Sequence, residues 1–281
     1  MGFFLQAPTD SKVASAQTAI GYNGRPMLLA VDIGNSHTVF GLFEDANLRR
    51  HFRVETRVGR TADELGAMLN GLLQLEGMAL GNITAGIISS VVPPATDAVE
   101  RLFIRHMGSS ALVVGPGIKT GMPVLYDNPR EVGADRIVNA VAAFDRYHGG
   151  AIVVDFGTAT TFDVVTPKGE YAGGIIAPGL VTAAEGLFRA TAKLPRVEIV
   201  RPKTAIGKNT VASIQSGLVF GYAGMVDALV ARIRTELDFD PRVVATGGLG
   251  AIVAAESTAI QDHDEFLTLT GLRIIHERNR N

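Results

Sequence analysis

The stretch AIVVDFGTATTFDVV, residues Ala151 to Val165, decides the fold. An apolar run ends on an acid, Asp155, and a glycine turn with three threonines precedes a second apolar run that contains Asp163. This pattern predicts two antiparallel buried strands whose turn carries a carboxylate, hydroxyls and the free backbone N–H groups of Gly157. Such N–H groups form an anion site, so a carboxylate beside them indicates a polyphosphate with a cation between the two.

The same design occurs earlier in the chain, in MLLAVDIGNSHTVFGLF, Met27 to Phe43. An apolar run again ends on an acid, Asp32, and Gly34, Ser36 and Thr38 follow before the next apolar run. A single hairpin of this kind is common in loops that bind nothing. Two copies separated by about half of the chain predict two similar domains that face each other with a phosphate site between them.

Composition limits the possible functions. The 281 residues are enough for one large or two medium domains, and 47% hydrophobic with 19% charged residues indicates a well-formed core. A net charge of −2 and a pI of about 6.3 argue against nucleic acid as a partner. The absence of cysteine excludes disulfides and thiolate nucleophiles and fits a cytoplasmic protein. No apolar run reaches the length of a membrane helix, so we expect no membrane partner.

Residues 1–26 are predicted to be a flexible N-terminal extension, followed by one domain over 27–149 and a second over 150–281. In the first domain, a strand is expected after the hairpin at 48–56, and the capping box of Thr61 and Glu64 opens a helix to about Leu75. The first domain is then predicted to continue with a strand before Pro93, a helix to about Met107 and a strand at 111–114. In the second domain, we expect a third strand ending near Gly179, helices at about 180–190 and 211–237, and a strand before Gly247.

Two predicted helices carry further information. Asp135 stands in the first turn of the helix that follows Gly133, where an acid usually only stabilises the helix dipole. Arg136 directly after it, with apolar residues on both sides, favours a functional acid equally well. The small residues Ser216 and Gly217 in the helix at 211–237 predict close packing against another helix, either within the chain or in a second copy of it.

Several of these stretches carry a family resemblance. DIGNSHT and DFGTATTFD resemble the two phosphate loops of the superfamily of sugar kinases, actin and heat-shock chaperones. Within it, the chain is more closely similar to the type III pantothenate kinases. The stretches that carry this similarity follow in the family's order: YDNPREVGADRIVNA (126–140), GGIIAPGL (173–180), TAKLPRVE (191–198), AIGKNTVASIQSG (205–217) and VVATGG (243–248).

The resemblance implies an α/β fold of two tandem ribonuclease H-like (actin-like ATPase) domains, each with a mixed five-stranded sheet flanked by helices. It also implies a homodimer that transfers phosphate from ATP to pantothenate, giving 4'-phosphopantothenate in the first step of coenzyme A biosynthesis. Asp135 would be the catalytic base. The expected ATP- and phosphate-binding residues are Asp32, Ile33, Gly34, Asn35, Ser36, His37, Thr38, Val39 and Thr158.

The remaining implied sites concern pantothenate and cations. The residues that match pantothenate-binding positions are Tyr126, Gly133, Ala134, Asp135, Arg136 and Thr210, the last acting across the dimer. Asp32 would hold Mg²⁺, directly or through water, and Asp155 would bind a monovalent cation, K⁺ or NH₄⁺. Arg136 suits the pantothenate carboxylate and a phosphate equally, because a guanidinium fork fits either group.

Two alternatives remain on the same fold. One is a non-enzymatic nucleotide switch or transcriptional accessory protein, which would not need an acid such as Asp135 to activate a hydroxyl. The other is a different small-molecule kinase, such as a sugar kinase, which would need clusters of sugar-binding polar residues that the sequence lacks.

Overall fold

The computed structural model describes residues 26–280, so the expected extension at 1–26 lies outside the described residues except for Pro26. The chain forms two five-stranded sheets, in the orders β3-β2-β1-β4-β5 and β10-β9-β6-β7-β8. Counted from the first strand of each sheet, these orders are the same, although the two sheets share little sequence beyond the hairpins. The prediction of an internally repeated α/β fold is confirmed.

The first sheet contains β1 (Met27–Ile33), β2 (His37–Glu44), β3 (Asn47–Glu55), β4 (Ile83–Ser90) and β5 (Ala111–Val113). The strand β1 pairs antiparallel with β2 and parallel with β4, which makes the sheet mixed. Alternate residues of β1, among them Leu29 and Val31, are fully buried under α1 and α2. Asp32, one residue before the end of β1, therefore stands where a buried strand reaches the sheet edge.

The second sheet contains β6 (Ala151–Phe156), β7 (Ala159–Val165), β8 (Tyr171–Pro178), β9 (Arg242–Thr246) and β10 (Asp262–His263). The central strand β6 pairs antiparallel with β7 and parallel with β9, as β1 does with its neighbours. Sequence patterns predicted the first four strands. They missed β10 because two residues are too short to show any periodicity.

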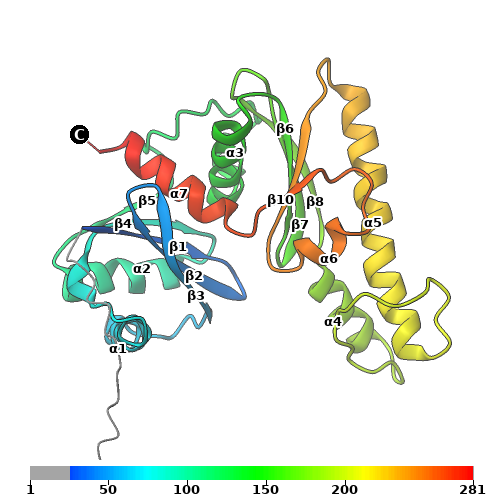
Figure 1. Cartoon of the computed structure of the whole chain (residues 1–281), viewed down its shortest axis with the longest axis horizontal. Coiled ribbons are helices and arrows are strands. Elements are labelled where there is room, and N and C mark those ends of the chain that lie inside the picture. Colours follow the sequence, from blue (N-terminus) through cyan, green and yellow to red (C-terminus); the bar gives the residue numbers. More distant parts are fainter. Residues whose placement is uncertain (1–25, 281) are drawn as a thin grey trace, which may run out of the picture.

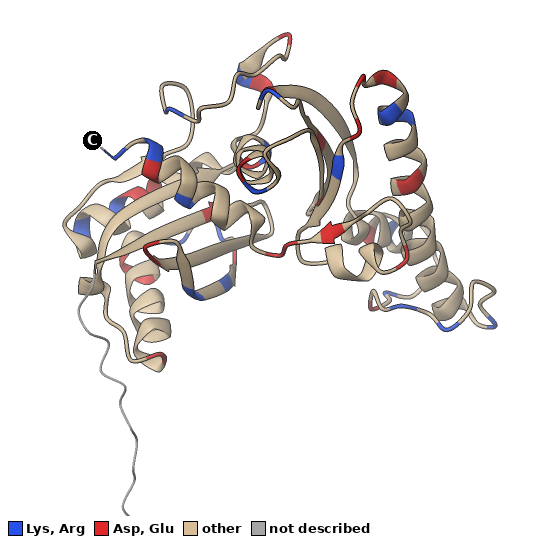
Figure 2. Ribbon diagram, turned by 45° about the horizontal axis from the view of Figure 1, so that its top comes forward, with Lys and Arg blue, Asp and Glu red and all other residues tan. Residues whose placement is uncertain are grey.

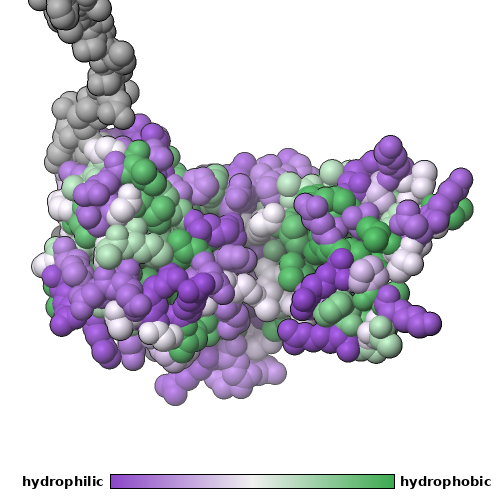
Figure 3. Space-filling model, turned by 90° about the horizontal axis from the view of Figure 1, so that it is seen from below, coloured by the Kyte–Doolittle hydropathy of each residue, from purple (hydrophilic) through white to green (hydrophobic). Residues whose placement is uncertain are grey.

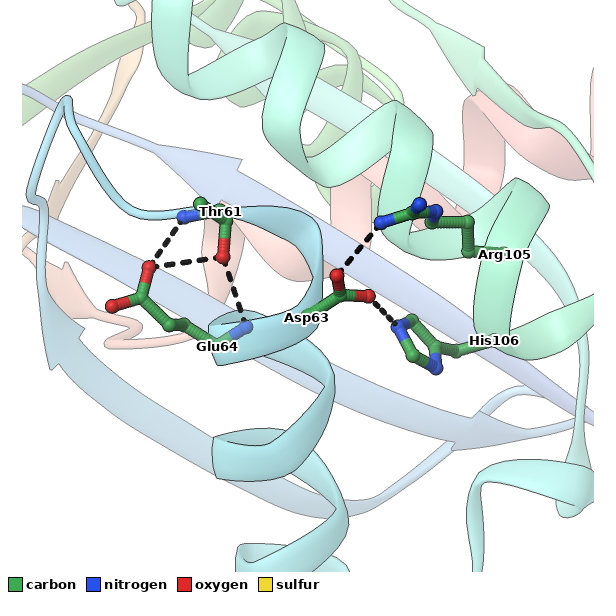
Figure 4. A network of polar contacts seen from close by, with 5 residues as sticks. All are labelled: Thr61, Asp63, Glu64, Arg105 and His106. Carbon is green, nitrogen blue, oxygen red and sulfur yellow. Dashed lines mark hydrogen bonds and ion pairs between the residues drawn. The ribbon is translucent and has the colours of Figure 1, made fainter.

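The helices are α1 (Ala62–Leu75), α2 (Pro93–Leu102), α3 (Ala134–Tyr147), α4 (Leu180–Ala190), α5 (Thr210–Glu236), α6 (Gly250–Ala254) and α7 (Leu267–Arg278). The predicted capping box of α1 is present, with Thr61 and Glu64 bonded reciprocally (Figure 4). Beside it, Asp63 accepts bonds from Arg105 and His106, which fixes the start of α1 against the turn after α2. Pro93 and Pro94 occupy the first two positions of α2, where the helix needs no N–H donor.

The helices α3 and α7 lie side by side between the two sheets (Figure 1). They share one core with both sheets, in which α3 residues such as Val138 and Val141 pack with Leu272 and Ile275 of α7. The sequence did not predict α7 or its position. Its chain leaves the second sheet and returns to pack against β1, β2 and β4, so the last helix of the chain covers the first sheet.

The helix α5 covers the outer face of the second sheet (Figure 1). Its length and a mean hydropathy of 1.4 meet the criteria for a membrane span, which corrects the expectation that no apolar run is long enough. The evidence for a span is weak, because core helices of soluble proteins meet the same criteria. Of the apolar window, 28% is buried within the chain, and the exposed positions of the helix are mostly small residues such as Gly217, Gly221 and Gly224.

The crossing of α3 and α7 depends on Gly271, because a Cβ there would stand 2.1 Å from the carbonyl oxygen of Val138. We expect Gly271→Ala to lower the free energy of unfolding by about 1–3 kcal/mol through overpacking. The control is Gly71→Ala in α1, where a Cβ meets no atom within 4 Å and helix propensity predicts a gain of about 1 kcal/mol. Urea unfolding measures both changes, and equal behaviour of the two variants would contradict the prediction.

Candidate active site

Three carboxylates meet where the two sheets face each other. Asp32 and Asp155 each stand one residue before the end of their strands, β1 and β6, and Asp135 lies in the first turn of α3. Burial and the nearby charge of Asp135 raise the pKa of Asp32 to about 7 and the pKa of Asp155 to about 7. Burial also raises the pKa of Asp135 itself. The sequence predicted these three acids, and the structure brings them together in a region poor in water.

The first phosphate loop is a tight turn braced by one threonine. The Gly34 N–H donates to the His37 carbonyl at 3.0 Å, and Ser36 lies exposed at the tip. Thr56, just after β3, donates from its hydroxyl to the Gly34 carbonyl at 2.8 Å and from its N–H to the Ser36 carbonyl at 3.0 Å. Its hydroxyl also lies 2.9 Å from that of Thr38. No sequence pattern assigned a role to Thr56, which follows the third strand and reaches the loop only in the folded sheet.

Other predicted residues of this loop differ in what they can offer a ligand. Ile33 is buried, and Val39 is paired with Asp32 in the hairpin, so both can contact a phosphate only through backbone atoms. Asn35 and His37 are exposed, which leaves their side chains free to approach a ligand.

The second phosphate loop lies directly against the first. The Ser36 and Thr158 hydroxyls are 3.2 Å apart, although 122 positions separate them in the chain. The Thr158 carbonyl accepts from the Thr182 hydroxyl at 2.6 Å and from the Gly179 N–H at 3.1 Å, which fixes the loop to the start of α4. The two hairpins predicted to face each other therefore do so, with their hydroxyl-bearing tips in contact.

Asp155 is oriented by a relay that joins both halves of the molecule. The Asn139 side chain of α3 donates to Asp155 Oδ2 at 2.9 Å, and the Thr268 hydroxyl of α7 donates to Asn139 Oδ1 at 2.7 Å. Gly247 covers the other oxygen with a backbone φ of +90°, and a Cβ there would stand 2.7 Å from Asp155 Oδ1. Asn139 lies in one of the stretches that carry the family resemblance, but no sequence pattern assigned a role to it or to Thr268.

Asp135 accepts the backbone N–H of Arg136 at its Oδ1, at 2.8 Å. It therefore stabilises the start of α3, as an acid in a first helical turn usually does. It also faces Asp32 and Asp155. Gly133 precedes the helix, and a Cβ there would lie 2.5 Å from Asp135 Oδ1, so only glycine leaves that oxygen its place. Ala134 is the first helical residue and is half-buried.

Two of the predicted pantothenate residues gather around Tyr171 at the start of β8. The rings of Tyr126 and Tyr171 are 6.4 Å apart, and the Arg136 guanidinium lies 5.8 Å from the Tyr171 ring centroid. The predicted residue Thr210 stands elsewhere. It begins α5 and lines a cavity of about 630 Å³ between α4 and α5, together with Leu187 and other residues, and Asp135 and Arg136 do not line that cavity.

The acid cluster suits a cation that is shared with a ligand. Within residues 26–280, no group of three or more His, Asp or Glu side chains is placed to hold a metal ion by itself. Asp32 and Asp155 are nevertheless partly buried carboxylates whose pKa values are raised first by loss of solvation and then by the nearby charge of Asp135. Phosphate oxygens would have to complete the coordination of any cation bound here.

Comparison with known structures places the chain in a class. It is similar to the structure of a protein assigned to the Baf family of transcriptional activators from Campylobacter jejuni, with a TM-score of 0.55 and 17% identity over 89% of this chain and 98% of that one. It is also similar to a protein assigned as a 2-dehydro-3-deoxygalactonokinase from Sinorhizobium meliloti, with a TM-score of 0.51 and 15% identity over 90% and 96% of the two chains. These similarities show that the chain has the same two-sheet α/β fold as these proteins.

Sequence comparison identifies the family. The profile of the type III pantothenate kinases matches residues 28–232. A type III pantothenate kinase from Anaeromyxobacter sp. (strain Fw109-5) is 58% identical over 254 residues, which cover 90% of this chain and 100% of that protein. The chain therefore belongs to the type III pantothenate kinase family.

The raised pKa of Asp155 gives a testable dependence of stability on pH. The folded protein keeps a proton on this acid up to pH of about 7, whereas an unfolded aspartate releases it near pH 4. This contribution to stability is therefore present below pH 4 and lost as the pH rises through 7. In nucleotide-free Tris buffer without K⁺ or Na⁺, we expect Asp155→Asn to stabilise the protein at pH 8 by on the order of 2 kcal/mol, and by less at pH 5.

Denaturant unfolding at the two pH values measures this difference. The control is Asp227→Asn, because burial raises the pKa of Asp227 but hydrogen bonds from Ser257 and Thr258 lower it overall. That substitution should destabilise the protein at pH 8. A stability gain for Asp155→Asn that does not depend on pH would show that ionisation of Asp155 is not its cause.

Proposed function

We propose that the protein transfers the γ-phosphoryl group of ATP to the primary hydroxyl of pantothenate, the first step of coenzyme A biosynthesis. The observation that carries this proposal is the position of Asp135 and Arg136 at the start of α3, against two facing phosphate loops, in a chain of the type III pantothenate kinase family. Phosphoryl transfer requires neutralised charge, an aligned hydroxyl and an acceptor for its proton. Separate parts of the site meet each requirement.

The two loops bind the ATP phosphates. Exposed N–H groups and hydroxyls at Asn35, Ser36 and Thr158 donate to phosphate oxygens, and the brace from Thr56 holds the first loop in its turn. The direct contact between Ser36 and Thr158 has to open when phosphates enter between them. Asp32 would hold Mg²⁺, directly or through water, and this ion supplies positive charge beside the transferred group.

Asp135 acts as the general base. Its carboxylate has one oxygen, Oδ1, bonded to the backbone N–H of Arg136, so the other oxygen is available to the pantothenate hydroxyl. Burial raises its pKa above the ordinary value for aspartate, which makes it a stronger proton acceptor than an exposed aspartate. The neighbouring Arg136, together with Tyr126, would orient the rest of pantothenate.

Asp155 would bind a monovalent cation, K⁺ or NH₄⁺. A buried carboxylate beside a polyphosphate repels it unless a cation bridges the two. The Asn139 side chain donates to one carboxylate oxygen, which fixes the group while leaving lone pairs for an ion. With Mg²⁺ engaged by Asp32 and the phosphates, a larger and more weakly hydrated ion fits the second position.

The proposal of a homodimer is supported by exposed apolar side chains on the second half of the molecule. Exposed apolar side chains lie on α4, α5 and the loop between them, and Figure 3 shows hydrophobic surface on that half. These residues are Val181, Leu187, Val200, Ile206 and Val211. A second copy covering them would enclose the cavity that Thr210 lines, which is how Thr210 could complete a site.

We further propose a cytoplasmic enzyme that binds neither nucleic acid nor membrane. Basic and acidic residues alternate along the ribbon of the described residues (Figure 2), and the net charge is −2. A dimer partner accounts for the apolar surface of α5 without a membrane. The transcriptional alternative takes no support from the Campylobacter jejuni protein, because similarity at 17% identity concerns the fold alone.

The base is tested by Asp135→Asn, which keeps the shape and the helix cap but cannot accept the proton. We expect turnover to fall by roughly 10²–10⁴-fold while ATP binding stays nearly unchanged. A coupled assay that offers ATP with pantothenate or with several sugars measures turnover, and calorimetry measures nucleotide binding. Near-normal turnover in the variant removes Asp135 from this role, and turnover with a sugar alone overturns the choice of substrate.

The cation is tested by titrating K⁺ at constant ionic strength and saturating Mg²⁺. We expect low activity in Na⁺ buffer that K⁺ or NH₄⁺ restores, because the carboxylate of Asp155 then has its bridging ion. Asp155→Ala should abolish the K⁺ response and raise the apparent KM for ATP. A flat wild-type curve from zero K⁺ upward would eliminate the monovalent site and leave the kinase assignment intact.

A further inference from the structure

A fully buried carboxylate next to the candidate site has no role in the mechanism above. Asp163, on β7, has no exposed surface, and its Oδ1 accepts from Arg136 Nε at 2.7 Å. The same oxygen accepts the Tyr171 hydroxyl at 2.8 Å, and Oδ2 accepts the Thr161 hydroxyl at 3.1 Å. Burial raises the pKa of Asp163 to about 6, so the group carries its charge at neutral pH. Three donors thus converge on one buried anion.

The partner of this carboxylate is a proposed substrate residue. The Arg136 side chain is 8% exposed, and among the described residues its Nη2 is buried without a hydrogen-bond partner. Gly174 on β8 leaves room for this nitrogen, because a Cβ there would stand 2.9 Å from it. A buried guanidinium nitrogen without an acceptor is costly, and an oxygen of a bound ligand would satisfy it.

We infer that Asp163 is a positioning residue, which holds Arg136 by Nε so that the rest of the guanidinium receives an oxygen of pantothenate. This inference rests on the proposed function. It assigns Asp163 a role in pantothenate binding that the family resemblance did not assign. The pantothenate side is favoured over the phosphate side because Arg136 and Tyr126 both pack on Tyr171, whereas the phosphate loops are braced by Thr56 and Thr182.

The pair also limits how Arg136 acts. An arginine on a flexible surface loses side-chain entropy when it binds a ligand, whereas this one is already fixed by an ion pair and by the Tyr171 ring. Removing the charge of Asp163 should therefore weaken substrate binding through a misplaced guanidinium. It should change the ATP site little, because Asp163 makes no described hydrogen bond to either loop tip and its charge raises the pKa of Asp155 less than burial and Asp135 do.

The test is Asp163→Asn, which keeps the side-chain shape and removes the charge. We expect the KM for pantothenate to rise by about tenfold or more, with the KM for ATP unchanged within about twofold. The matched control is Asp227→Asn, since Asp227 is also held by several donors but lies on α5, bonded to Ser257 and Thr258. The control should lose stability without changing the KM for pantothenate.

A double-mutant cycle separates positioning from general disruption. If Asp163 acts through Arg136, then Asp163→Asn should change the KM for pantothenate by less than about twofold in an Arg136→Lys background. Should Asp163→Asn fail to fold, Thr161→Val removes one neutral donor to Asp163 with little change of shape. That variant should raise the KM for pantothenate by about two- to fivefold and leave the KM for ATP unchanged.

The outcomes distinguish the two proposals. A wild-type protein without turnover on pantothenate overturns the proposed function and this inference with it. An active wild type with an unchanged KM for pantothenate in Asp163→Asn, or in Thr161→Val where that variant is used, overturns the positioning role alone. Equal rises in both KM values, or full additivity with Arg136→Lys, also overturn it, because they indicate a structural effect.

Discussion

The clustering of three partly buried carboxylates is the constraint on which the rest of the structure depends. Asp32, Asp135 and Asp155 come from two sheets and one helix, and loss of solvation raises the pKa of each, with the charge of Asp135 adding to the effect on the other two. An arrangement of this kind persists only when strong packing elsewhere holds it, here the core that α3 and α7 share with both sheets. The stability spent on the acids is recovered when cations and phosphates arrive, so the resting site favours ligand binding.

The neighbouring groups show how the fold tolerates this charge. Asn139 fixes Asp155, and Thr268 in turn fixes Asn139, so that these two side chains hold one of the acids in a defined position. Arg136 forms its ion pair with Asp163 on β7 and not with the three clustered acids. The positive charge therefore stays beside the proposed base without forming an ion pair that would block it.

The sequence predicted the hairpins and the acids because each belongs to a local pattern: a buried strand, an acid at its end, and a glycine turn. The repetition of that pattern predicted two similar domains, whereas the strand order of the sheets is known only from the structure. Thr56, Asn139 and Asp163 received no role because their partners are distant in the chain, 27 positions away in the case of Asp163 and Arg136. A threonine that ends a strand or an asparagine inside a helix is common, and only the fold shows what it touches.

The return of α7 to the first sheet has a consequence for biosynthesis. Residues 267–278 leave the ribosome long after β1, β2 and β4, yet they pack against all three strands. Until α7 emerges, β1, β2 and β4 present apolar side chains that this helix later covers. The nascent first half therefore waits in an incompletely folded state for most of synthesis, and during that time chaperones can bind it and aggregation can compete with folding.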